Sequence, residues 1–388
     1  MRRISFKSES GAILPIVIIL MLALTITGIA FLSASVLEHS LAMREVYKNQ
    51  AFFLADAGID HLTFKLYHWE QPTLIGPTPL GDGQYQVVAD YDPTPPDEPF
   101  AISTGQRLKG AEVKAEQKIR VRISSKPIFD YAVFADEKIT LTGKSAVGGD
   151  IGTNSTNDDA ITLVGGATAD GDAWVGPGGD PNEVISGEEN ITGKLDALAE
   201  KIPMEPYPLP IPMPPTYPGL LSVPGGDTQT IPGDGYYPDG ITVNGHLIID
   251  KPCTLVISRL RVQGGGDDGK ITITSDVTPP GESVIIYITD EATLAGAGIV
   301  NETEDARALY IYGTENCSSV IFSGSRDLCA AVYAPEADIS CSGDAYVKGS
   351  LVGNTVTAVG TGEVVYDENL GGDDAPSFPV LRDWQQVS

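Results

Sequence analysis

The first long apolar stretch of the chain covers residues 12–37 and contains no charged side chain. A membrane hydrocarbon core about 30 Å thick is crossed by about 20 apolar residues in a helix. The stretch therefore predicts a transmembrane helix over residues 12–37. Arg2, Arg3 and Lys7 precede it, and the positive-inside tendency places this short basic end in the cytoplasm and the rest of the chain across the membrane.

Apolar residues continue at helical spacing beyond the uncharged stretch, now interleaved with charged residues. They are Leu37, Leu41, Val46, Phe52, Phe53, Ala57, Ile59, Leu62 and Leu66. No proline lies between Ile16 and Gln71, so we predict one continuous helix over residues 12–68. A cleaved signal peptide is the rival interpretation, but its apolar core is about 7–15 residues long and ends at a small-residue cleavage site.

The region after the helix changes from helical periodicity to the alternation typical of strands. Residues 70–99 are rich in Pro, Gly and Asp, with one short apolar run at 84–91. Residues 111–123 then alternate apolar and charged side chains, which predicts a half-buried strand. We expect residues 69–126 to form a neck and a small antiparallel sheet that packs on the lower half of the helix.

Residues 127–370 contain many apolar runs of three to five residues separated by Gly, Asp and Asn. Strands this short bury little individually, but rungs stacked in a coil cover one another. We therefore predict an α+β protein whose long helix and small sheet precede a right-handed parallel β-helix or β-solenoid. A β-sandwich is the alternative, because its strands also recur at intervals of about 8–12 residues. Residues 371–388 are expected to be a C-terminal tail.

The predicted β-domain is interrupted by a proline-rich segment at residues 203–218, where eight of sixteen residues are proline. Proline fixes φ and removes a hydrogen-bond donor, so this segment is polyproline II and not a strand inside a sheet. We interpret it as a stiff strap across the β-domain, with Leu209, Ile211 and Met213 as its apolar edge; recognition by an aromatic groove is the alternative. Residues 191–202 just before it have the pattern of a short helix.

Charge separates the two parts of the chain. The 52 acidic and 25 basic residues give a net charge of −27, and residues 1–70 are balanced, so the excess lies in the exported part. An acidic surface of this kind argues against nucleic-acid binding, which needs basic patches for phosphate. It is compatible with solubility or with divalent cations.

The sequence offers few candidates for chemistry. Cys253, Cys317, Cys329 and Cys341 lie in the predicted exported domain, where disulfides are permitted, and buried free thiols are the alternative. Asp-rich turns at 157–159, 170–172 and 267–268 lack the spacing of a calcium loop, although Ca²⁺ binding stays open. His246 stands alone in a predicted strand. We expect no catalytic residue, cofactor or metal site.

The N-terminal region resembles a known family. The segment KSESGAILPIVIIL at residues 7–20 resembles a type IV prepilin leader, a basic peptide ending in Gly11 directly before an apolar helix. The segment QAFFLADAGID at residues 50–60 is similar to the helix of minor pilins of the PilX type. The resemblance covers about residues 7–66. It implies a leader over residues 1–11, cleavage between Gly11 and Ala12 by a prepilin peptidase, and N-methylation of Ala12.

One position departs from the major-pilin pattern. Major pilins carry Glu at the fifth mature residue, where this chain has Ile16. An intramembrane carboxylate needs a partner, and in a filament that partner is a neighbour's terminal ammonium. The resemblance thus implies a minor subunit at or near the tip of a pilus or pseudopilus.

Such a subunit would meet other pilins through its helix in the inner membrane, and its periplasmic β-domain would later reach the cell surface. There it would serve adhesion, to a surface or glycan, or assembly. A polysaccharide-active enzyme and a passive membrane-anchored envelope protein are the alternatives.

Overall fold

The computed structural model of the chain describes residues 13–67, 70–93, 98–265, 268–279, 281–324, 327–371 and 376–387. The chain divides into two compact units. Unit 1 comprises residues 1–65, 71–124 and 381–388, and unit 2 comprises residues 66–70 and 125–380. Unit 1 is therefore built from discontinuous segments, because unit 2 is inserted within it.

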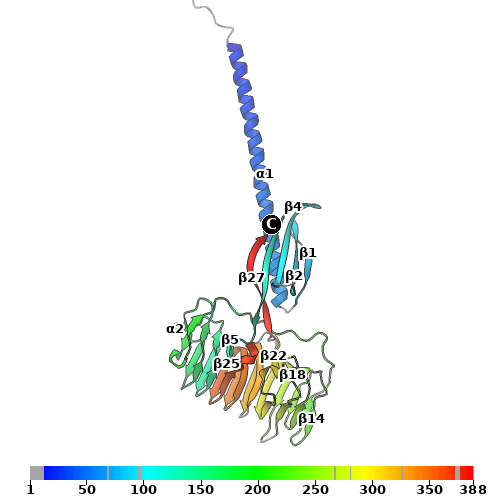
Figure 1. Ribbon diagram of the computed structural model, residues 1–388, viewed down its shortest axis with the longest axis vertical. Helices are drawn as coiled ribbons and strands as arrows, with labels where there is room; N and C mark the ends of the chain where they lie inside the picture. Colours follow the sequence, from blue (N-terminus) through cyan, green and yellow to red (C-terminus); the bar gives the residue numbers. More distant parts are fainter. Residues whose placement is uncertain are drawn as a thin grey trace, which may run out of the picture. The chain divides into compact units, whose positions relative to one another are not determined.

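The helix α1 runs continuously over Ile13–Tyr67 (Figure 1). In its apolar half, the hydroxyls of Thr25, Thr27 and Ser33 donate hydrogen bonds to the backbone carbonyls four residues earlier, at 2.7, 2.8 and 2.9 Å. Such bonds allow hydroxyls to lie in an apolar environment without an unpaired donor. The predicted long N-terminal helix is confirmed.

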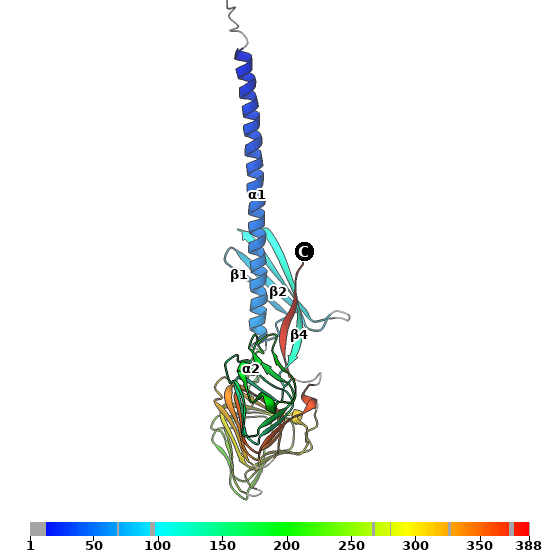
Figure 2. The ribbon, with the colours of Figure 1, turned by 90° about the vertical axis from the view of Figure 1, so that its left-hand side faces the viewer.

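A five-stranded sheet packs against the C-terminal half of α1 in unit 1 (Figure 2). In sheet order its strands are β1 (Leu74–Leu80), β2 (Gly83–Asp90), β3 (Phe100–Lys109), β4 (Glu112–Pro127) and β27 (Ser377–Val387). The β1–β2, β2–β3 and β3–β4 pairs are antiparallel, as predicted. The buried apolar side chains that the helix contributes to unit 1 are Ala51, Leu54, Ala55, Ile59 and Leu62.

Close approach between helix and sheet depends on small residues. Gly105 lies so near the helix that a Cβ on it would be 2.1 Å from the Ala51 carbonyl oxygen. Ser103 is fully buried and donates to the Ala55 carbonyl at 2.6 Å. The sheet is thereby held against α1 by backbone contact as well as by apolar packing.

The segment expected to be a C-terminal tail instead contains β27, which is an edge strand of this sheet. Arg122 of β4 pairs with Asp383 at 2.8 Å, and Gln117 of β4 accepts a hydrogen bond from Gln386. Pro379 makes the sequence look unlike a strand, but an edge strand tolerates a missing donor.

Unit 2 is a β-solenoid in which the strand pairs of the described residues are all parallel (Figure 1). One sheet contains β5 (Val133–Gly143), β6 (Ala146–Gly148), β7 (Ile151–Thr153), β8 (Ile161–Val164), β9 (Thr168–Asp170), β10 (Ala173–Val175), β11 (Ile185–Ser186), β12 (Leu195–Ala197), β13 (Leu221–Val223), β15 (Gly235–Tyr237), β16 (Ile241–Val243), β18 (Cys253–Val262), β20 (Val284–Gly296), β22 (Leu309–Gly313), β23 (Ser319–Gly324), β24 (Leu328–Gly343), β25 (Tyr346–Gly360) and β26 (Glu363–Tyr366). A second sheet contains β14 (Thr228–Thr230), β17 (His246–Ile249), β19 (Lys270–Ile273) and β21 (Gly298–Asn301). Parallel ladders confirm the parallel β-helix prediction and exclude the β-sandwich, whose sheets are antiparallel.

The rungs are not stacked in chain order. The first solenoid strand, β5, pairs with β7 and β8 on one side and with β25 on the other. The chain builds from β5 to β12 at one end of the stack. It then crosses to the opposite end at β13 and builds back until β25 closes against β5. The crossing segment includes the proline-rich residues 203–218.

The helix predicted over residues 191–202 is absent. This region instead contains a loop that follows the short helix η1 (Glu188–Asn190), and then the strand β12, which pairs with β10. Leu198 and Ile202 are buried, as an apolar helix face would be, but they follow a strand that completes the last rung. The remaining short helices are α2 (Pro181–Val184), η2 (Ala306–Ala308) and η3 (Glu368–Gly371).

Candidate functional site

The apolar half of α1 is one candidate site. Among the described residues, one helix is long and apolar enough to cross a membrane, and its most apolar window has a mean hydropathy of 2.6 and no buried residue. Leu14, Ile18, Leu22 and Phe31 are each more than half exposed. Apolar side chains on all faces of a helix that packs on nothing in its own chain need lipid or other helices around them.

The predicted processing site, Gly11 and Ala12, lies outside the described residues. Cleavage there stays a prediction from the sequence.

The four cysteines are free thiols and all are buried, so none of the candidate disulfides is formed. Cys329 and Cys341 lie on the same strand, β24, twelve residues apart, and cannot meet. Cys253, Cys317 and Cys341 pack into the solenoid core. Burial raises the pKa of each of the four thiols to about 12, which keeps them protonated and poor nucleophiles at neutral pH.

His246 and the Asp-rich turn at residues 170–172 are engaged within the fold, whereas Asp267 of the turn at 267–268 lies outside the described residues. His246 contacts the Thr272 hydroxyl at 2.8 Å, and desolvation, with Lys270 nearby, lowers the pKa of this histidine. In the Asp-rich turn, Asp172 accepts from the Lys194 backbone at 2.7 Å and thereby links two rungs. Within the described ranges no group of three His, Cys, Asp or Glu residues is arranged to hold a metal ion.

The proline-rich strap, residues 203–218, crosses a ladder of aromatic and aliphatic side chains on the outer face of unit 2. The ladder runs over aligned positions of adjacent rungs: Tyr236, Val256, Tyr287, Tyr312, Tyr333, Val352 and Phe134. Tyr207 of the strap stacks on Tyr312, with ring centroids 4.1 Å apart and planes inclined by 13°. Tyr333 donates to the Glu205 carbonyl at 2.7 Å. The stacked ring of Tyr207 and the backbone carbonyl of Glu205 therefore hold the strap on the ladder.

The expected apolar edge of the strap is exposed rather than buried. Ile211 is 96% exposed, and Leu209 and Met213 are also exposed. The alternating pattern predicts burial of this edge, but the contacts that hold the strap are made by the Tyr207 ring and the backbone of Glu205. A signal for this existed in the alternation of Tyr310 and Tyr312, whose hydroxyl-bearing rings face outward on β22 and need a cover.

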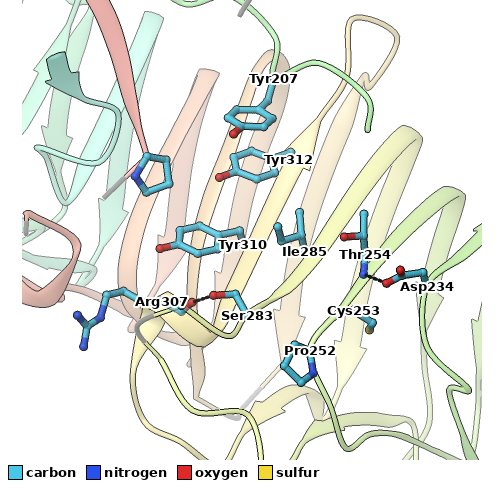
Figure 3. A pocket seen from close by; sticks show the side chains of 12 residues that line it. Tyr207, Asp234, Pro252, Cys253, Thr254, Ser283, Ile285, Arg307, Tyr310 and Tyr312 are labelled. Carbon is cyan, nitrogen blue, oxygen red and sulfur yellow. Dashed lines mark hydrogen bonds between the residues drawn. The ribbon is translucent and has the colours of Figure 1, made fainter. Parts of the chain in front are cut away.

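A cavity of about 580 Å³ opens beside the strap (Figure 3). Tyr207, Tyr312 and Tyr310 lie one above another on one side, with their hydroxyls pointing the same way. Asp234, Thr254, Cys253 and Pro252 lie on the other side, and Ile285 lies between.

The charged groups of this cavity are already paired. Asp234 accepts from the Thr254 backbone at 2.8 Å, and Arg307 forms an ion pair with Asp305 at 2.7 Å. Burial raises the pKa of Tyr310 to about 12 and that of Cys253 to about 12, so both groups are neutral. The lining offers neutral hydroxyls and no activated nucleophile.

Comparisons with known proteins give a partial picture. Residues 218–372 match a family described as "Domain of unknown function (DUF7305)". No curated protein matches the chain.

Similar solved structures include an ice-binding protein of the Antarctic ascomycete Antarctomyces psychrotrophicus, with 13% identity over 62% of this chain and 95% of that chain and a TM-score of 0.32. A second is the competence-associated pilin ComZ of Thermus thermophilus, with 14% identity over 88% of this chain and 97% of that chain and a TM-score of 0.29. A third is the DUF3494 domain of a Shewanella frigidimarina ice-binding protein, with 16% identity over 62% of this chain and 95% of that chain and a TM-score of 0.34. At these TM-scores the likeness carries no conclusion about function.

Proposed function

We propose that the chain is a minor pilin-like structural subunit that α1 anchors in the inner membrane and that displays its β-solenoid outside it. The observation that carries the proposal is the division of α1 into two halves. The N-terminal half is uncharged and exposed, whereas Ala51, Ala55 and Leu62 of the C-terminal half are buried under the antiparallel sheet. A rigid head attached to a free apolar rod suits transfer of the rod from lipid into a bundle of other helices.

The proposed partners follow from the rod and from the leader. A prepilin peptidase would cut between Gly11 and Ala12 and the new terminus would be methylated. Other pilins would pack around α1, and Ile16 at the fifth mature position favours a minor subunit at or near the tip. The solenoid would face the periplasm and then the cell surface, for adhesion or assembly, and the proposal assigns it no catalytic role and no cofactor.

The leader provides the direct test. Gly11→Leu is expected to block cleavage, because a bulky side chain replaces the residue that the leader pattern requires at the cut. Intact-mass measurement of the protein from a host with a prepilin peptidase is expected to show the parent chain without residues 1–11 and the variant with them.

Gly28→Leu is the matched control, since a Cβ at Gly28 meets no atom within 4 Å. It is expected to be processed like the parent. A parent protein that keeps residues 1–11 and never enters sheared surface filaments would contradict the proposal and favour a passive membrane-anchored envelope protein.

A further inference from the structure

A second outer face of the solenoid carries two rows of small uncharged side chains, which we name the hydroxyl face. The first row lies on aligned positions of seven successive rungs: Thr293, Ile321, Ser340, Thr357, Thr140, Thr162 and Ser186. The second row lies two residues further along six of these strands: Ala295, Ser323, Ser342, Val359, Thr142 and Val164. Rungs are about 4.8 Å apart, so each row extends over roughly 25–30 Å.

The period-two pattern of the strands places these rows outside the core. On β5, Ile139 and Leu141 are fully buried, whereas Thr140 and Thr142 are partly exposed. On β25, Val356 and Ala358 are buried around the partly exposed Thr357. The burial that stabilises the solenoid therefore does not explain the residue types of the outward rows.

The composition of the hydroxyl face is unusual for this chain. None of its thirteen positions is charged, although charged residues make up 20% of the sequence and the net charge is −27. It contains no aromatic side chain either. Its border is charged, since Arg261 pairs with Glu291 at 2.7 Å on the rungs at one end. A neutral strip within an acidic molecule fits a neutral partner.

Most hydroxyls of the face are available, although the Thr162 hydroxyl of the first row donates to the Asp159 carbonyl at 3.0 Å. Thr140, Thr142, Thr293 and Thr357 form no side-chain hydrogen bond with any described residue, whereas Thr355 on the border donates to Asp338 at 2.6 Å. A threonine hydroxyl both donates and accepts, so a row of them offers repeated two-way hydrogen bonding.

We propose that the hydroxyl face binds a neutral polysaccharide chain laid along the rows. The repeat of the rungs supplies hydroxyls at regular intervals, and a neutral polysaccharide supplies its own hydroxyls along a chain without charge. Ile321 interrupts the first row. A polymer whose hydroxyls rotate accommodates that interruption. Each hydrogen bond contributes little against water, so binding depends on many contacts at once.

The test uses the full-length chain in detergent and its sedimentation with insoluble cellulose and chitin. Thr140→Val/Thr357→Val removes two adjacent hydroxyls while keeping the branched shape, and binding to the neutral polymer is expected to fall about tenfold. Thr140→Ser/Thr357→Ser keeps both hydroxyls and is expected to bind like the parent. Thr228→Val/Thr230→Val on the exposed strand β14 is the matched control and is expected to bind like the parent.

Circular dichroism and the unfolding temperature of every variant establish that the fold is intact. Equal binding by the parent and the Thr140→Val/Thr357→Val variant would overturn the proposal, as would binding to neither polymer. Adsorption to growing ice without binding to either polysaccharide would also overturn it and would assign the face to a water lattice. This assay does not involve filament assembly, so its result is independent of the proposed pilin role.

Discussion

At the scale of single residues, the strap shows what determines burial. Tyr207 and Ile211 both belong to an alternating apolar pattern in residues 203–218, yet Tyr207 stacks on Tyr312 and Ile211 is 96% exposed. Hydrophobicity along the chain predicts that some residues of a segment will be covered. It does not identify them, because the choice depends on which rungs lie beneath, and those rungs come from a part of the chain more than 75 residues later.

Tyr207→Ala is expected to destabilise unit 2 by about 2 kcal/mol, because it removes a half-buried ring and its stacking on Tyr312. Ile211→Ala is the control and is expected to change the unfolding free energy by less than about 0.5 kcal/mol, as exposed substitutions do. Urea unfolding followed by tyrosine fluorescence measures both. Equal effects of the two substitutions would show that the strap is not held by the stack.

At the scale of elements, the strap length fits its crossing. Asn154, directly after β7, exchanges two 2.8 Å hydrogen bonds with the Ile202 backbone, and Thr216 forms a parallel bridge with Tyr236 of β15. Eight rung spacings separate these points, about 38 Å at 4.8 Å each. Fourteen residues of polyproline II reach about 43 Å. An extended segment without ladder hydrogen bonds covers this distance, which gives the proline content a structural reason.

Deleting Leu209 and Pro210 shortens this reach to about 37 Å, just below the crossing distance. We expect the bridge between Thr216 and Tyr236 to open, where the Tyr217 N–H donates to the Tyr236 carbonyl and the Tyr236 N–H donates to the Pro215 carbonyl, both at 2.8 Å. Amide exchange at Tyr217 and Tyr236 is expected to accelerate at least tenfold. Inserting two residues at the same place only adds slack and is expected to leave both amides protected; equal protection in the deletion variant would refute the length argument.

The elements also show how far the sequence pattern extends. The long helix, the antiparallel sheet and the parallel rungs follow from periodicities of 3.6 and 2. The failures lie at residues 191–202, where a three-residue strand and a coil replace a helix, and at β27, whose proline concealed an edge strand. In both places pairing with a distant strand overrides local preference.

At the scale of the whole molecule, unit 2 is inserted between β4 and β27 of unit 1. These strands are neighbours, so the two ends of the insertion leave the sheet side by side. This insertion could not be predicted from the sequence, because a closing strand 250 residues after its partner has no local signature.

Replacing residues 128–376 with a short Gly-Ser linker is therefore expected to leave α1 and the five-stranded sheet folded. Removal of residues 128–388 also deletes β27 and exposes the edge of β4, and it is expected to give a protein that is degraded or aggregates. Limited proteolysis and circular dichroism in detergent distinguish the two. An unfolded linker variant would show that unit 1 depends on unit 2.

On the proposed export route, the pairing of β25 with β5 determines when the solenoid is complete and resistant to proteases. When the residues that follow α1 are translocated in sequence order, β5 to β12 can stack early, yet the other side of β5 has no neighbour until residue 360 has crossed. For most of its transit the chain carries an open strand edge that its own last rungs will cover. If the solenoid is exported as proposed, its folding is completed only at the end of translocation, and a stalled or truncated chain leaves that edge exposed to chaperones or proteases.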